Sequence, residues 1–145
     1  MEKDYVMKKF SASTEINASP ETIWSILTDG ERYPEWDPGM ERLEGKVAAG
    51  EKITAHTKLS PRAFPVTVSV FEPNRKMVWS SGMPLGLFKG ARTTTLTPMD
   101  DGKTSVTVEE VFSGLLSPLI GRTIPDLQPS FNNFVEGLKQ RAESA

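Results

Sequence analysis

Glu110 is the most informative ionisable residue of the sequence. It lies in a strand-like segment, residues 104–112, where every second position from Val106 to Phe112 is apolar except Glu110 itself. Because successive side chains of a strand point to opposite faces, Glu110 is predicted to point inward with its apolar neighbours. An isolated ionised carboxylate inside a protein costs free energy, so a positive charge is expected nearby.

Arg92 is the candidate for that charge. Its strand-like segment precedes that of Glu110, and a short turn joins the two. In the register that pairs Pro98 with Thr104, Arg92 lies opposite the carboxylate, whereas a slip of two residues places Thr94 there. Three roles are open: a structural ion pair, a polar anchor for the head group of a ligand, or general acid–base catalysis. The structural pair is favoured, because no nucleophile or second titrating group accompanies it and arginine stays protonated.

His56 is the only histidine. On its strand-like segment it shares a face with lysines, whereas the opposite face carries Ile53 and Ala55. Strand alternation therefore predicts that His56 faces solvent, and a serine–histidine–acid triad is not expected. The chain has no cysteine, which excludes disulfides, thiolate nucleophiles and cysteine-ligated zinc. No cofactor and no metal ion are expected.

Each of the three tryptophans has an aromatic ring that can serve as core or as the wall of a pocket. Trp36 lies in a proline-rich turn, residues 33–38, where it either closes the end of the core or borders a pocket entrance and donates its N–H to a ligand. Trp79 is predicted to be core or pocket wall. Trp24 is predicted to pack from a short helix.

The segment at residues 82–90, GMPLGLFKG, is an apolar loop that contains three glycines. Loops normally lie at the surface, so exposed apolar side chains there need an explanation. Two interpretations stay open: a lid over a hydrophobic pocket, and a tight connection that buries its side chains at the sheet edge. The segment lacks the pattern of a phosphate-binding loop.

Alternation of polar and apolar residues between turn signals predicts seven strands. The predicted strands are residues 8–17, 42–47, 51–59, 64–71, 77–81, 90–97 and 104–112. The connections are too short for crossover helices, so an antiparallel meander is expected. Ser19 followed by Pro20 is typical of a helix start, and one or two short helices are expected before the second strand.

A long helix is predicted at the end of the chain. From Leu116 onward, apolar residues recur at three- and four-residue spacing, and Pro125 and Pro129 interrupt this repeat. Asp126 is the predicted N-cap of the main helix, residues 127–142. The apolar stripe of this helix is the largest surface available to cover one face of the sheet. A helix packed on one face of an antiparallel sheet is an α+β fold, which we therefore expect.

Composition indicates a single domain spanning residues 1–145, with 17 basic and 19 acidic residues and a net charge of −2. This balance gives no electrostatic case for nucleic acid. No apolar run approaches the roughly 18 residues of a membrane span, so no stable membrane insertion is expected. The charged first ten residues do not resemble a secretory signal, and a cytoplasmic protein is expected.

Five motifs in order resemble a known family. They are SPETIW at residues 19–24, Asp29, YPEWDP at residues 33–38, DGKT at residues 101–104 and EVFSG at residues 110–114. Together they resemble the SRPBCC superfamily (START-like, helix-grip), in its polyketide cyclase/dehydrase-like branch, over essentially the whole chain.

The resemblance implies a helix-grip fold: a seven-stranded curved antiparallel sheet wrapped around a long C-terminal helix, with two short helices after the first strand. It also implies a cavity between sheet and helix, in which members bind lipids, polyketides, hormones or other apolar molecules, and a minority catalyse. Cyclase-like members often carry histidine at the position of Arg92, so their chemistry does not transfer directly.

The leading hypothesis is that the protein binds or carries a small hydrophobic ligand, lipid- or polyketide-like, in that cavity. The alternatives are a cyclase- or dehydratase-type enzyme using Glu110 and Arg92, and a protein–protein interaction module. A small apolar molecule is the expected partner, and the sequence identifies no protein partner. The residues predicted to contact the ligand are Trp36, Ile53, Ala55, Phe64, Val66, Val68, Trp79, Leu85, Phe88, Arg92, Thr94, Glu110, Phe112, Phe131 and Phe134.

Overall fold

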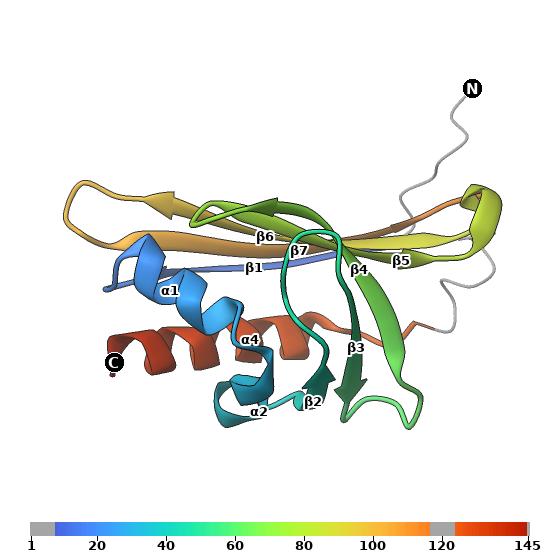
Figure 1. The fold of residues 1–145 in the computed structure, drawn as a ribbon, viewed down its shortest axis with the longest axis horizontal. Helices are drawn as coiled ribbons and strands as arrows, with labels where there is room; N and C mark the ends of the chain where they lie inside the picture. The colour runs from blue at the N-terminus through green and yellow to red at the C-terminus, as the bar shows by residue number, and fades with distance from the viewer. Residues whose placement is uncertain (1–7, 117–123, 145) are drawn as a thin grey trace.

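The computed structural model describes residues 8–116 and 124–144, and it is built around one antiparallel sheet of seven strands (Figure 1). The strands are β1 (Lys8–Ile16), β2 (Met40–Glu44), β3 (Lys52–Thr57), β4 (Phe64–Glu72), β5 (Lys76–Gly82), β6 (Lys89–Pro98) and β7 (Thr104–Ser113). Their order in the sheet is β1-β7-β6-β5-β4-β3-β2, so strands from β2 to β7 pair with their neighbours in the chain and β1 pairs with β7. The predicted antiparallel meander is confirmed.

The second strand begins and ends earlier than predicted, at Met40–Glu44 in place of residues 42–47. Gly45 follows it with a φ of +98°, in the left-handed region that favours glycine. A side chain at this position would also meet the carbonyl oxygen of Lys52 at 2.9 Å. Val47 is buried in the loop beyond, so its apolar character reflects core packing and not strand pairing.

Two short α-helices follow β1, as the resemblance implies. The first, α1 (Pro20–Leu27), begins as predicted: Ser19 is the N-cap, and its Oγ accepts a hydrogen bond from the Thr22 N–H at 3.1 Å. A 3₁₀ turn, η1 (Gly30–Arg32), leads into α2 (Tyr33–Trp36). These elements form the turn-rich segment that the two prolines predicted.

The C-terminal helix, α4 (Gln128–Glu143), begins one residue later than predicted. Its N-cap is Leu127 and not Asp126, although Asp126 Oδ1 accepts a hydrogen bond from the Gln128 N–H at 3.1 Å. Residues 124–127 are not helical, in agreement with the break expected from the prolines. The apolar repeat at residues 117–123 lies outside the described residues.

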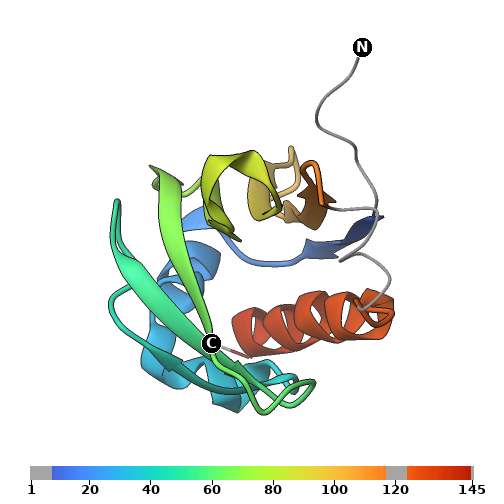
Figure 2. The ribbon, with the colours of Figure 1, turned by 90° about the vertical axis from the view of Figure 1, so that its right-hand side faces the viewer.

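α4 lies across the concave face of the sheet, and the sheet bends around it (Figures 1 and 2). Its buried side chains are Phe131, Phe134, Val135, Leu138 and Ala142. They complete a core that contains Ile16, Ile53, Val68, Met77, Leu96, Val106 and Val108 from the strands. The predicted helix-grip α+β fold is confirmed. Within the described ranges, no helix is both long enough and apolar enough to cross a membrane.

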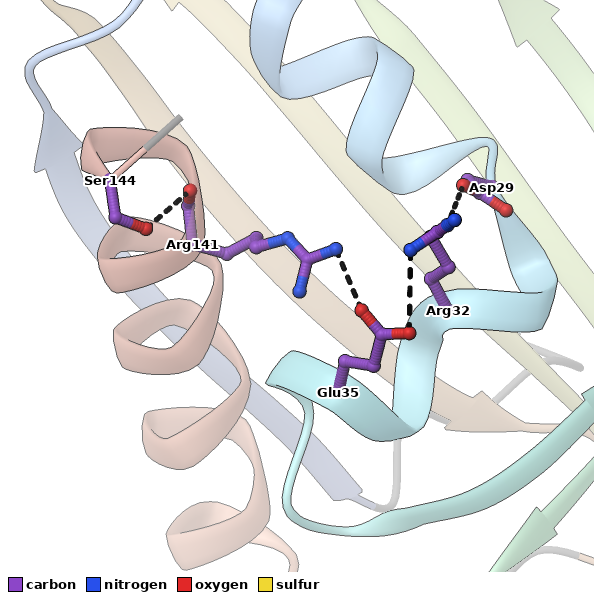
Figure 3. A network of polar contacts seen from close by, with 5 residues as sticks. All are labelled: Asp29, Arg32, Glu35, Arg141 and Ser144. Atoms are coloured by element: carbon purple, nitrogen blue, oxygen red, sulfur yellow. Dashed lines mark hydrogen bonds and ion pairs between the residues drawn. The ribbon is translucent and has the colours of Figure 1, made fainter.

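Side-chain contacts hold α2 against the last turns of α4 (Figure 3). Glu35 bridges two cations, with one oxygen 2.8 Å from the Arg141 guanidinium and the other 3.5 Å from that of Arg32. Gly137 of α4 packs so closely on the Trp36 carbonyl that a side chain at this position would overlap the oxygen. This junction sets the position of Trp36 at the edge of the core.

Candidate functional site

Arg92 and Glu110 occupy directly opposite positions on β6 and β7, in the register that pairs Pro98 with Thr104. Of the two registers left open by the sequence, the structure therefore has the first. The predicted ion pair is wrong: among the described residues, the Arg92 guanidinium approaches no carboxylate to within ion-pair distance and its side chain makes no hydrogen bond. The two side chains instead extend toward different neighbours.

The Arg92 guanidinium packs on two aromatic rings of α4. Its central carbon lies 4.8 Å from the centre of the Phe131 ring and 4.7 Å from that of Phe134. A planar guanidinium over an aromatic face is a favourable cation–π arrangement that also restricts the side chain. These rings cannot accept conventional hydrogen bonds, so they hold the charge in place without using its N–H groups.

Glu110 is half-buried, and its Oε2 lies 3.4 Å from where a side chain at Gly90 would begin. Burial raises the pKa of Glu110 above its ordinary value of 4.5, and the positive charge of Arg92 offsets part of that rise. The absence of a side chain at Gly90 leaves room for both this carboxyl group and the Phe112 ring, which would be 3.1 Å from a methyl group there.

Asp37 is a second buried carboxyl group near Arg92, and the sequence reasoning missed it. Asp37 is 7% exposed, and its Oδ1 accepts a hydrogen bond from the Gly39 N–H at 3.1 Å. Burial raises the pKa of Asp37, while Arg92, the Gly39 hydrogen bond and the charge of Lys58 each lower it. Asp37 lies in an irregular turn, so no periodicity in the sequence could have shown that it points inward.

Tyr33, Trp36 and Trp79 form an aromatic cluster that reaches α4. The Tyr33 ring lies 4.6 Å from that of Trp36 and 5.9 Å from that of Trp79 between ring centres, and Trp36 is 5.2 Å from Phe134. The fully buried Tyr33 hydroxyl donates to the Leu27 carbonyl at 2.6 Å, and burial raises its pKa far above the ordinary value. Trp79 pairs with Arg92 across β5 and β6.

The indole N–H groups of Trp36 and Trp79 are both buried without an acceptor among the described residues. Buried polar groups in proteins are hydrogen-bonded in roughly 90% or more of cases. Trp79 lies opposite Arg92, which is half-buried and whose side chain makes no hydrogen bond to the described residues, so this part of the core carries donors without protein acceptors. The sequence predicted the two indoles as core or pocket wall, but it could not show that their donors lack partners.

The other residues predicted to contact a ligand are divided between the interior and the surface. Ile53, Ala55, Val68 and Thr94 are buried, as are the Phe131 and Phe134 rings. Val66, Phe88 and Phe112 are half-buried. Phe64 is 45% exposed and Leu85 is 93% exposed at the tip of the β5–β6 connection. Their contacts with a ligand stay predictions.

His56 lies on the outer face of the sheet, as its position in the strand predicted. Its Nε2 is 2.7 Å from Glu44 Oε1 and 3.2 Å from the Arg42 guanidinium on the neighbouring strand. The side chain is 26% exposed, so the two neighbours partly cover it and it is less open to solvent than expected. It takes no part in the interior cluster.

One end of the sheet carries all the large apolar side chains that are exposed in the described part of the chain. They are Leu59, Phe64, Met83, Leu85 and Leu115. At this end of the sheet, β3, β5 and β7 end and β4 and β6 begin. Figure 2 views the molecule from this end. η2 (Pro84–Gly86) forms the tip of the β5–β6 connection, where the backbone N–H of Leu116 donates to the Leu87 carbonyl at 2.6 Å.

Two surface hollows lie away from the interior cluster. One, of about 670 Å³, is lined by residues 28–31 and 42–47, and the other, of about 460 Å³, includes residues 74–76 and 95–98 in its wall. Neither is the cavity between sheet and helix that the resemblance implies. The described residues contain no cluster of histidine, aspartate or glutamate suited to hold a metal ion.

Comparison with known proteins assigns the family. Residues 7–143 match the model of the family described as polyketide cyclase/dehydrase and lipid transport, so the chain belongs to that family. No curated protein matches the chain.

Solved structures share the fold at low sequence identity. A START superfamily protein from Mycobacterium smegmatis has 19% identity and a TM-score of 0.66, covering 94% of this chain and 97% of its own. A hypothetical protein from Helicobacter pylori has 9% identity and a TM-score of 0.74, covering 94% and 89%. Norcoclaurine synthase from Thalictrum flavum, a point mutant in complex with a transition-state analogue, has 14% identity and a TM-score of 0.71, covering 99% and 98%.

Proposed function

We propose that the protein binds a small, largely apolar molecule between its sheet and α4, with the polar end of that molecule beside Arg92. The observation that carries the proposal is the pair of buried indole N–H groups of Trp36 and Trp79 that have no acceptor. A core evolved only for stability has little reason to keep two unsatisfied donors, because each costs free energy on burial. A bound molecule that supplies the acceptors removes this cost.

The surroundings of these donors support an apolar body for the ligand. Ligand sites are mostly apolar with a few convergent polar groups, and here aromatic rings surround one guanidinium and two carboxyl groups. The rings of the interior pack on one another, so binding requires Phe131, Phe134 or their neighbours to move. The family description includes lipid transport, which is consistent with an apolar cargo.

The apolar end of the sheet is the proposed entrance. Met83 and Leu85 in the β5–β6 connection and Leu59 in the β3–β4 connection are exposed there. In this proposal the loop at residues 82–90 acts as a lid, which is one of its two predicted interpretations. The cytoplasmic location stays a prediction.

The experiment is native mass spectrometry of the purified protein, followed by thermal unfolding with straight-chain C8 to C16 acids, alcohols and amines. Binding to the folded state raises the melting temperature with ligand concentration, by mass action. Replacing Trp79 by Phe should weaken this stabilisation. The matched control is Trp24→Phe: Trp24 packs on Phe71 from α1, and its N–H is not among the buried unsatisfied groups. If neither a co-purified ligand nor a melting shift is found with any of these probes, the proposal is contradicted.

A specific observation also favours a second candidate, proton-transfer catalysis. Glu110 is a partly buried carboxyl group with a raised pKa beside a positive charge, as general acids often are. Incubation with polyketide-like β-dicarbonyl compounds, followed by product analysis, tests it. Turnover that is abolished in Glu110→Gln while ligand binding persists would establish the enzyme, and binding without turnover would establish the carrier.

A further inference from the structure

We propose that the polar end of the ligand is a carboxylate, held by the guanidinium of Arg92 and the indole N–H of Trp79. This inference rests on the proposed function, because it names the chemical class of the molecule bound at the same site. It follows from the hydrogen-bonding capacity, the rigidity and the charge of the described residues around Arg92.

Donors outnumber acceptors in the interior cluster. An arginine side chain offers five N–H donors and each indole offers one, and no acceptor uses those of Arg92, Trp36 or Trp79 within the described residues. The Tyr33 hydroxyl already donates to Leu27, so it does not serve these donors. A ligand rich in acceptors therefore complements the cluster, and a ligand that brings further donors does not.

Rigid placement makes Arg92 suited to a planar anion. The Phe131 and Phe134 rings hold the guanidinium at 4.8 and 4.7 Å, while leaving its N–H groups without partners. A guanidinium binds a carboxylate through two parallel hydrogen bonds, which neither a hydroxyl nor an ammonium group can reproduce. Because Trp79 lies opposite Arg92 on the neighbouring strand, its N–H is a third donor within reach of the same anion.

Two carboxyl groups, on β7 and after α2, lie close enough to Arg92 to feel its charge. Glu110 lies on β7 and Asp37 follows α2, whereas Trp79 of β5 and the two rings of α4 are aromatic. Lys58, which follows β3, acts on Asp37. Both carboxyl groups have raised pKa values because of burial, so both take up protons more readily than in water. A carboxylate from outside would supply acceptor oxygens to the Arg92 guanidinium, and carboxyl groups with raised pKa values oppose it less than carboxylates of ordinary pKa would. An ammonium ligand would instead meet the like charge of Arg92.

The experiment compares three probes of equal length: dodecanoate, dodecanol and dodecylammonium, each below its micelle concentration at pH 6. Isothermal titration calorimetry on the full chain should give dodecanoate an affinity about tenfold or more above that of dodecanol, as expected for charge-assisted hydrogen bonds. Arg92→Gln should remove this preference while the affinity for dodecanol stays nearly unchanged. Arg92→Lys should restore part of it, and Trp79→Phe should reduce it severalfold.

The matched control is Arg42→Gln on the outer face of the sheet, where Arg42 lies 3.6 Å from Glu44 and far from the interior. It should leave the preference for dodecanoate intact. Equal affinities for dodecanoate and dodecanol, or a preference that survives in a folded Arg92→Gln variant, would overturn the inference and leave the proposed function standing. Failure of all three probes to bind would overturn both.

Discussion

Arg92 and Glu110 face each other across β6 and β7, yet their charged groups do not meet, because Arg92 lies over the Phe131 and Phe134 rings while the Glu110 carboxyl lies beside Gly90. Two residues that are paired in the sheet register therefore need not have side chains that interact. This arrangement leaves a half-buried cation that is held over two rings and has no hydrogen-bonded acceptor among the described residues, and this property underlies the proposed ligand site.

The first prediction concerns the energetic coupling of these two residues. Removing one partner of a buried ion pair costs roughly 3–5 kcal/mol, because the other charge is left uncompensated. Since the two groups are not in contact here, we expect a coupling energy below about 1 kcal/mol. A double-mutant cycle with Arg92→Met and Glu110→Gln, measured by urea unfolding, gives this quantity. A coupling of several kcal/mol would mean that the side chains pair in solution.

The second prediction concerns the pH dependence of stability. Burial raises the pKa of Glu110 in the folded state above its ordinary value of 4.5, so the folded protein binds more protons than the unfolded chain over that interval. Stability should therefore fall as pH rises from about 4.5 through the raised value. Asp37 contributes a drop of the same sign from its ordinary value of 3.8 upward.

The measurement is urea unfolding of the wild type and Glu110→Gln at several pH values between 4 and 8. Glutamine cannot ionise, so the variant should gain stability relative to the wild type as pH increases. Arg92, Asp37 and Lys58 remain in the variant, and the difference therefore isolates Glu110. Parallel curves for the two proteins would show that this carboxyl group is not penalised by burial.

The third prediction concerns Gly137 in the middle of α4. Alanine is the better helix former by about 1 kcal/mol, and on propensity alone Gly137→Ala should stabilise the protein. A methyl group here would overlap the Trp36 carbonyl oxygen, however, so α2 must move away from α4. We expect a net loss of about 1–3 kcal/mol, typical of overpacking. Glu136→Ala on the exposed side of the same helix should change stability by less than about 0.5 kcal/mol.

The fourth prediction contrasts two apolar side chains of the predicted site. Phe131 is 2% exposed, and Phe131→Ala should lower the free energy of unfolding by about 3–5 kcal/mol through lost burial and a residual cavity. Leu85 is 93% exposed, so Leu85→Ala should leave stability within about 0.5 kcal/mol. Chemical denaturation of both variants checks this, and a loss below about 1 kcal/mol for Phe131→Ala would indicate an open pocket around the ring.

The strands and the β6–β7 register could be predicted because they depend on local rules. Alternation along residues 104–112 follows from one buried face, and the length of the 98–103 turn leaves few registers. The direction of the Arg92 side chain was not predictable in this way, since it depends on two rings of α4 that lie far along the chain. Asp37 was missed because a turn has no periodicity, and only its distant neighbours bury it.

Gly137 was also missed, for a different reason. A glycine inside a helix looks unfavourable by propensity, and its purpose appears only when the backbone of α2 is seen against it. For the apolar loop at residues 82–90, the sequence could not decide between a lid and a tight, buried connection, because no local rule shows whether a loop covers a pocket. In the structure Leu85 is exposed while Leu87 and Phe88 are half-buried, so the loop has features of both.

The most direct test of ligand binding beside Arg92 uses the three indole N–H groups of the chain, which give separate signals in a ¹H–¹⁵N NMR spectrum. Single Trp→Phe variants assign the signals to Trp24, Trp36 and Trp79. On titration with dodecanoate, we expect the Trp79 signal to move downfield as its N–H gains an acceptor, with a smaller change for Trp36 and none for Trp24. Saturable binding that leaves the Trp36 and Trp79 signals unchanged, or that shifts Trp24 alone, would contradict it.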